Sequence, residues 1–130
     1  MTEALTDTTG TRVAVGVELA DPVSAYTITV DDGPVVGRAE FVDNPKAEGE
    51  RIIFHTEVDQ DFAGRGLAKI LLEEALADSI RRGLTIVPVC PLFARHLTRR
   101  GDEFVAAGGM FRSPTRADLS AVTVAVRHRP

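Results

Sequence analysis

The sequence predicts an α+β domain built on a mixed sheet, and three observations support this prediction. The length of 130 residues suits one domain, and 44% hydrophobic with 26% charged residues is an ordinary globular composition. Before residue 59, stretches of alternating or β-branched residues are separated by short turn sequences, as in an antiparallel meander. After residue 60, the apolar residues recur at helical spacing. We therefore expect antiparallel strands, then a helix, a strand and a second helix.

The strands of the first half follow from this alternation. The pair Asp32-Gly33 is typical of a tight hairpin turn, and Asp21-Pro22 breaks the strand before it. Residues 1–11 are polar and acidic, and we expect them to be flexible, with residues 12–130 forming one domain. The predicted strands are residues 12–19, 24–30, 35–42 and 51–58.

The second half begins with a strong helix that starts near Leu67, carries its apolar residues on one stripe and stops at Gly83. A buried strand is predicted at residues 84–90. Pro88 inside it cannot donate to a sheet, so we expect this strand to diverge from its neighbour and to open a slot. The later elements are predicted to be a helix from Pro91 to about Arg100, a helix start at Ser113-Pro114 and a last strand at residues 122–126.

Charge and cysteine content exclude several classes of protein. The net charge of −4 argues against nucleic acid or an anionic membrane as the main partner. Residues 1–94 carry 8 basic and 16 acidic side chains, whereas residues 95–130 carry 7 and 3. An anionic ligand near the basic part and a solvated helix face both fit that asymmetry. Cys90 has no partner for an internal disulfide, and we find no secretory signal or membrane-spanning run, so we expect a cytoplasmic protein.

The most informative motif is a glycine turn, Gly64-Arg65-Gly66, which follows Val58 by six residues and precedes the long helix. Glycines allow positive φ angles and close approach, and the free N–H groups of a first helical turn bind anions such as pyrophosphate. Arg65 adds charge there. A plain strand-to-helix turn explains the same residues. The chain has no P-loop sequence, and Lys69 stands where a dinucleotide fingerprint needs its third glycine.

Candidate reactive side chains lie on either side of this turn. His55 and Glu57 are two residues apart, so a strand presents them on one face, with Thr56 and Val58 on the other. They suit a base and its partner, or a solvated strand end. Cys90 precedes a helix, which favours a reactive thiol, although a small buried residue is the alternative reading. The histidines show no ligand spacing, so we expect no metal.

The residues HTEVDQDFAGRGLAKILLEEALADSIRRGLTIVPVCP resemble the short, minimal members of the GNAT superfamily of N-acetyltransferases, and the resemblance covers about residues 24–100. It implies a sheet that is antiparallel at first and then splayed between two central strands, with helices at its sides. Acetyl-CoA would lie in the splay, with its pyrophosphate on the N–H groups of Ala63 through Leu67 and its pantetheine along Glu57 and Val58. The cofactor-binding residues are thus expected to be Val58, Ala63, Gly64, Arg65, Gly66 and Leu67.

Three departures from the superfamily pattern stand out. Position 61 is Asp where the superfamily motif usually begins with Gln or Arg, so its side chain must point away from the pyrophosphate. Two helices that shape the acceptor site in larger members are missing. The only tyrosine is Tyr26, far from the position of the general acid in many relatives.

The resemblance implies transfer of an acetyl group to a small-molecule or protein amine, with Glu57 or His55 as base. Cys90 is then either a proton donor to the departing thiolate or a transient acyl acceptor. An acyl-CoA-binding or sensor module without turnover, and a purely structural domain, are the alternatives.

Overall fold

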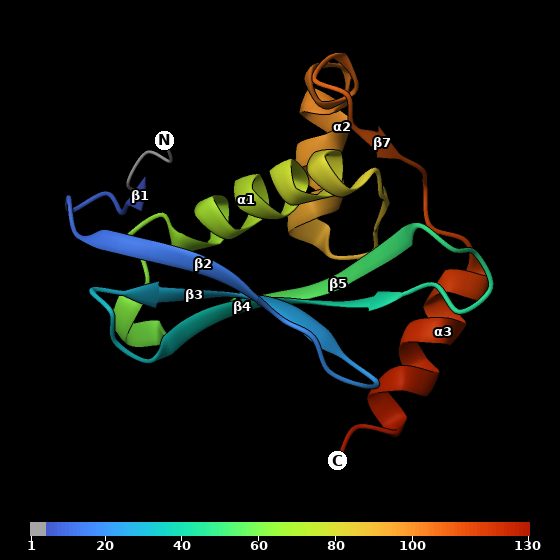
Figure 1. The fold of residues 1–130 in the computed structure, drawn as a ribbon, viewed down its shortest axis with the longest axis horizontal. Coiled ribbons are helices and arrows are strands. Elements are labelled where there is room, and N and C mark those ends of the chain that lie inside the picture. The colour runs from blue at the N-terminus through green and yellow to red at the C-terminus, as the bar shows by residue number, and fades with distance from the viewer. Residues whose placement is uncertain (1–4) are drawn as a thin grey trace.

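The computed structural model describes residues 5–130 and shows a seven-stranded sheet in which every strand lies beside its predecessor in the chain (Figure 1). The first five strands pair antiparallel, and the last two join in parallel. This arrangement confirms the predicted mixed sheet that begins as a meander. The strands are β1 (Leu5–Thr6), β2 (Arg12–Glu18), β3 (Ser24–Val30), β4 (Val35–Asp43), β5 (Glu50–Val58), β6 (Thr85–Pro88) and β7 (Met110–Phe111).

Helices cover both faces of the sheet. A short 3-10 helix, η1 (Gln60–Phe62), precedes α1 (Leu67–Arg82); α2 (Pro91–Ala106) follows β6, and α3 (Arg116–Arg127) follows β7. The main core lies between the sheet and α1 with α2, around fully buried residues such as Phe41 and Phe93. A smaller core on the opposite face packs α3 against the sheet (Figure 1). We call these two sides the α1 face and the α3 face.

The helix α1 forms where its apolar stripe predicts it. Leu71 and Leu72 are buried in the main core, as are Ala75 and Leu76 one turn later. At its end, Gly83 adopts the left-handed conformation with φ +66°, and its N–H donates to the carbonyls of Ser79 and Ile80. Glycine reaches this conformation without the steric cost that other residues bear, so the predicted stop is confirmed.

The helix α2 is longer than predicted. It begins at Pro91 as expected but continues beyond Gly101, with a break in helical geometry at Arg100 (φ −128°, ψ 21°). A side chain on Gly101 would approach the Phe111 ring to 2.7 Å. The glycine therefore allows β7 to pack closely against a bent helix instead of ending that helix.

The last predicted strand is wrong, because residues 122–126 lie inside α3. These valine-rich residues have high strand propensity, but Ala121, Val122 and Ala125 share one helical face that packs on the smaller core. Burial of that face decides the structure here. Thr115 rather than Ser113-Pro114 caps the helix, through a reciprocal capping box with Asp118.

The structure also differs from prediction at the N-terminus. Residues 5–11, which we expected to be flexible, form β1 and a turn that packs on the loop before α1. The first part of that expected flexible segment, residues 1–4, lies outside the described residues. The β3–β4 hairpin forms as predicted, except that Asp31 and Asp32 take the left-handed conformation.

Candidate active site

The central strands separate at the position that Pro88 indicated. The pairing of β5 with β6 ends where Ile53 lies opposite Pro88. Beyond that point, the N–H groups of Val89 and Cys90 both donate to the carbonyl of Ile53, at 3.0 and 2.8 Å, as the chain turns into α2. β5 continues to Val58 with β4 as its partner. The edge of β5 after Ile53 is therefore available to an extended ligand, as the predicted splay requires.

The glycine turn lies at the end of this edge. Gly64 and Gly66 have φ angles of +78° and +77°, and Gly66 caps α1 without any side-chain hydrogen bond. The N–H groups of residues 64–69 donate to no described residue, as expected for a helix start. Ala63 differs from expectation, since its N–H donates to the carbonyl of Gln60 at 3.1 Å. Leu67 contributes its N–H to the helix start, while its side chain is buried.

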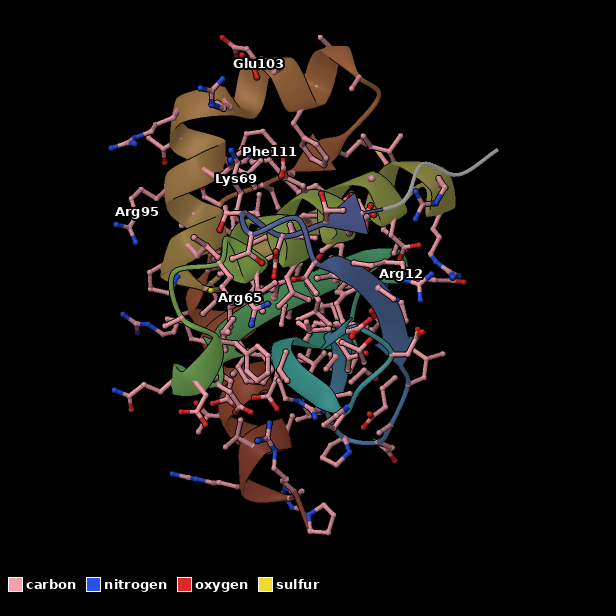
Figure 2. The ribbon with its side chains drawn as sticks, turned by 90° about the vertical axis from the view of Figure 1, so that its left-hand side faces the viewer. Arg12, Arg65, Lys69, Arg95, Glu103 and Phe111 are labelled. Carbon is pink, nitrogen blue, oxygen red and sulfur yellow. The ribbon has the colours of Figure 1, made fainter. Side chains whose placement is uncertain are left out.

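The Arg65 side chain does not point toward the anion-binding N–H groups. Its Nε donates to Oδ2 of Asp7 at 2.9 Å, and its guanidinium lies 5.1 Å from the centre of the Phe62 ring. Figure 2 shows Arg65 lying against the body of the protein, whereas Arg95 projects outward from α2. The expectation that Arg65 adds charge to a phosphate site is thus replaced by an internal ion pair. Asp61, which had to point away from a pyrophosphate, is exposed on η1.

A β-bulge in β5 determines which side chains face which side. Glu40 pairs with His55 but its neighbour Phe41 pairs with Ile53, so Phe54 is an extra residue on β5. Ile53 and Val58 consequently pack on the same core although they are five positions apart along the strand. Without the bulge, regular alternation would send one of them to the opposite face.

His55 and Glu57 share the α3 face, as their spacing predicted. Their side chains are 52% and 61% exposed, and His55 Nε2 lies 3.4 Å from Glu57 Oε2. Such exposure leaves both groups accessible to a molecule arriving on this face. A hollow of about 270 Å³ borders Glu57 and is lined in addition by Arg38 and Asp59.

Cys90 lies on the other side of the splay. It is buried at the start of α2, and its Sγ is 3.4 Å from Oγ1 of Thr56. The bulge places Thr56 on the α1 face, so Cys90 contacts the strand on the side opposite His55 and Glu57. The structure therefore does not bring the three candidate catalytic side chains into one cluster.

Tyr26 takes no part in this arrangement. Its hydroxyl donates to Asp78 at 2.7 Å and accepts from Arg51 at 2.8 Å, beneath α1. Burial and the bond to Asp78 raise the pKa of Tyr26 to about 12. The only tyrosine of the chain thus belongs to a buried hydrogen-bond network.

Sequence reasoning missed two groups of residues. Asp7 lies 58 residues from its partner Arg65 in the chain, so no local pattern pairs them. Glu40 is buried on the α3 face, where Arg129 from the end of the chain contacts it at 3.2 Å and Arg38 at 3.7 Å. Charged residues at alternating positions of a central strand were the available signal for this second group.

Within residues 5–130, no group of three or more histidine, cysteine or acidic side chains is placed to hold a metal ion. Over the same residues, no helix has both the length and the apolar character needed to cross a bilayer.

Comparison with known families identifies the fold. A family profile described as GCN5-related N-acetyl-transferase matches residues 25–106, which is more than half of the chain. The chain belongs to this family. The matched part of the chain begins at β3 and ends with α2, so it contains β5, the glycine turn and Cys90. Asp7 and α3 lie outside it. No curated protein sequence matches this chain significantly.

Solved structures similar to this chain include the ribosomal-protein-S18-alanine N-acetyltransferase of Escherichia coli, with 21% identity and a TM-score of 0.45. That similarity covers 54% of this chain and 43% of the other. Ribosomal-protein-alanine N-acetyltransferase from Brucella melitensis biovar Abortus 2308 has 18% identity, a TM-score of 0.44 and coverage of 85% and 64%. The AAC(6')-Iy structure with a CoA-based bisubstrate analogue has 20% identity, a TM-score of 0.42 and coverage of 75% and 67%. The chain thus spans less than two thirds of the length of the first two.

Proposed function

We propose that this chain is an acetyl-CoA-dependent N-acyltransferase that transfers an acetyl group to an amine. One observation carries the proposal: the unpaired edge of β5 leads directly to the glycine turn, whose N–H groups have no described acceptor. A pantetheine chain needs an extended backbone partner, and a pyrophosphate needs clustered N–H donors. The free edge of β5 supplies the extended partner, and the glycine turn that follows it supplies the N–H donors. Membership of the family supports the same ligand.

The structure leaves fewer N–H groups free for the ligand than the sequence suggested. The N–H groups of Gly64, Arg65, Gly66 and Leu67 are the proposed pyrophosphate donors, since that of Ala63 is already bonded. Backbone groups of Glu57 and Val58 are the proposed pantetheine partners. When bound, acetyl-CoA supplies the activated acetyl thioester. We find no metal-binding group in the described residues, and the proposed chemistry uses none.

Glu57 and His55 are the proposed bases. An amine must lose its extra proton before its nitrogen can attack a carbonyl, and an ammonium ion has no lone pair to use. Both side chains are exposed on the α3 face beside the end of the splay, so an acceptor on this face meets them first. The acceptor is proposed to be a small-molecule or protein amine that arrives on the α3 face at the hollow beside Glu57.

Cys90 has a proposed role on the opposite side of the edge. Its thiol is 3.4 Å from the Thr56 hydroxyl and buried, so it can give a proton to the departing thiolate or pack as a small apolar residue. Direct attack by the amine needs no acyl group on Cys90. We further propose a cytoplasmic location, which the lone cysteine supports.

The test uses purified protein, acetyl-CoA and a panel of primary amines. Binding of acetyl-CoA measured by calorimetry supports the ligand, and amine-dependent release of CoA supports turnover. Glu57→Gln and His55→Gln, alone and together, should lower the rate while leaving acetyl-CoA affinity close to wild type. Binding with no CoA release across the panel would instead favour an acyl-CoA-binding module, and the absence of binding would favour a structural domain.

A further inference from the structure

The turn between β1 and β2 packs on the glycine turn. We call residues 7–11 the N-terminal turn. The N–H of Thr8 donates to the carbonyl of Arg65 at 3.1 Å, and the Thr8 hydroxyl donates to the carbonyl of Gly64 at 3.4 Å. A side chain on Gly66 would come within 3.1 Å of the Thr8 methyl group. The two segments are therefore in direct contact along the whole glycine turn.

Asp7 holds both segments together. One of its carboxylate oxygens, Oδ1, accepts from the N–H and hydroxyl of Thr9 and from the N–H of Thr11, at 2.8, 2.6 and 3.0 Å. The other oxygen, Oδ2, accepts from Arg65 at 2.9 Å. The Asp7 side chain is fully buried, at 0% exposure. One oxygen thus shapes the N-terminal turn and the other anchors the glycine turn to it.

These contacts orient the peptide groups of the glycine turn. In a trans peptide, the N–H of each residue points opposite to the carbonyl of the residue before it. The carbonyls of Gly64 and Arg65 point toward Thr8. Consequently the N–H groups of Arg65 and Gly66 point away from the N-terminal turn, and neither donates to a described residue. This is the orientation that a pyrophosphate on the outer side of the loop requires.

The ion pair with Arg65 also offsets the negative charge of Asp7, which would otherwise disfavour an anionic ligand. A bare carboxylate beside the loop would repel an anionic ligand, but Asp7 is neutralised by Arg65 and satisfied by the N–H and hydroxyl groups of its own turn. Arg65 therefore serves the loop through its contact with Asp7 rather than through contact with phosphate.

We infer that Asp7 is a positioning residue for acetyl-CoA: acting through Arg65, it holds the glycine turn with its N–H groups directed at the pyrophosphate. The inference rests on the proposed function. It assigns a role in ligand affinity to Asp7, which lies outside the matched family region.

The chain offers a matched pair of variants for the test. In Asp7→Asn, the amide oxygen can keep the bonds within the turn while the bond to Arg65 is lost. Asp118 is a second buried carboxylate that combines a turn contact with an arginine contact, far from the glycine turn. Its Oδ2 accepts from the N–H of Thr115, and both of its oxygens accept from Arg112. Asp118→Asn therefore removes a comparable aspartate–arginine contact without touching the proposed site.

Calorimetry with acetyl-CoA and thermal unfolding are measured on the full chain for wild type and each variant. We expect Asp7→Asn to raise the Kd about tenfold, and Asp118→Asn to leave it unchanged at a similar loss of Tm. Arg65→Met also removes the contact but leaves the Asp7 carboxylate unpaired beside the loop, so its loss of affinity should be at least as large as that of Asp7→Asn. The double variant should be no worse than Arg65→Met alone, because both substitutions act on the same contact.

An unchanged Kd in both Asp7→Asn and Arg65→Met, equal losses of affinity in Asp7→Asn and Asp118→Asn, or additive effects in the double variant would each overturn the inference while leaving the proposed function in place. Failure of the wild-type protein to bind acetyl-CoA would overturn the proposed function and this inference with it.

Discussion

Replacing Gly64 by alanine tests the proposed pyrophosphate loop with an internal control. Gly64 and Gly83 have φ angles of +78° and +66°, and a Cβ at either position meets no atom within 4 Å. The left-handed conformation costs a residue with a side chain about 1–2 kcal/mol. Each kcal/mol corresponds to roughly 4 °C in Tm for a chain of this size. Gly64→Ala and Gly83→Ala should therefore lose similar stability, from opposite ends of α1.

Only Gly64→Ala should also lose affinity for acetyl-CoA. A Cβ at Gly64 would project into the space where the ligand is proposed to bind, and relief of the backbone strain would rotate the N–H groups proposed to bind it. We expect the Kd to rise at least tenfold, or about 1.4 kcal/mol, with a larger effect for Gly64→Val. Calorimetry at a temperature where both variants are folded measures this. Equal Kd values for Gly64→Ala and Gly83→Ala would show that the glycine turn is an architectural turn only.

Four further outcomes are expected. Acetyl-CoA at ~100 times its Kd should stabilise the fold by about 2.7 kcal/mol in a thermal-shift assay, with little effect from ATP or NAD; equal shifts would point to a general nucleotide site. Mass spectrometry after incubation with acetyl-CoA should show no stoichiometric acetyl adduct that Cys90→Ala abolishes. Arg129→Gln should lower the KM for amines in a CoA-release assay, because it removes one of the two arginine contacts of Glu40 on the α3 face, where the acceptor is proposed to arrive. Hydrogen bonds from Arg112 lower the pKa of Asp118 to about 2, so its contribution to stability is complete above pH ~4 and lost as the pH falls toward ~2. Asp118→Asn should flatten the acid limb of a Tm–pH curve over that range.

The accuracy of the sequence predictions depended on how far apart the interacting residues are. The meander and α1 were predicted from periodicity because each depends on residues that are neighbours in the chain or one turn apart. The residues 122–126 were misassigned because their strand propensity competes with burial against β4 and β5, which the local sequence does not contain. The slot beside β5 was predictable because Pro88 cannot donate a hydrogen bond wherever it lies.

In the candidate site, too, local features were predictable and long-range contacts were not. The positive φ angles of Gly64 and Gly66, and the shared face of His55 and Glu57, are consequences of residue type and spacing. The role of Arg65 was not predictable, because its partner Asp7 lies in the N-terminal turn, 58 residues away in the chain. The bulge at Phe54 was equally hidden, since it is defined by pairing with β4 and not by a residue pattern of its own.

The order of strands in the sheet has a consequence for how the protein is made. Each strand pairs with the one that the ribosome has just produced, so no strand has to wait for a later one to be inserted beside it. The sheet can grow by addition at one edge during synthesis, which limits the time that any edge is exposed to other nascent chains. The α3 face of the sheet, in contrast, is covered late. Val42 and Ile52 remain uncovered until α3, the last described element to emerge, docks on them. Translation pausing late in the message would therefore leave an apolar patch open on an otherwise folded sheet.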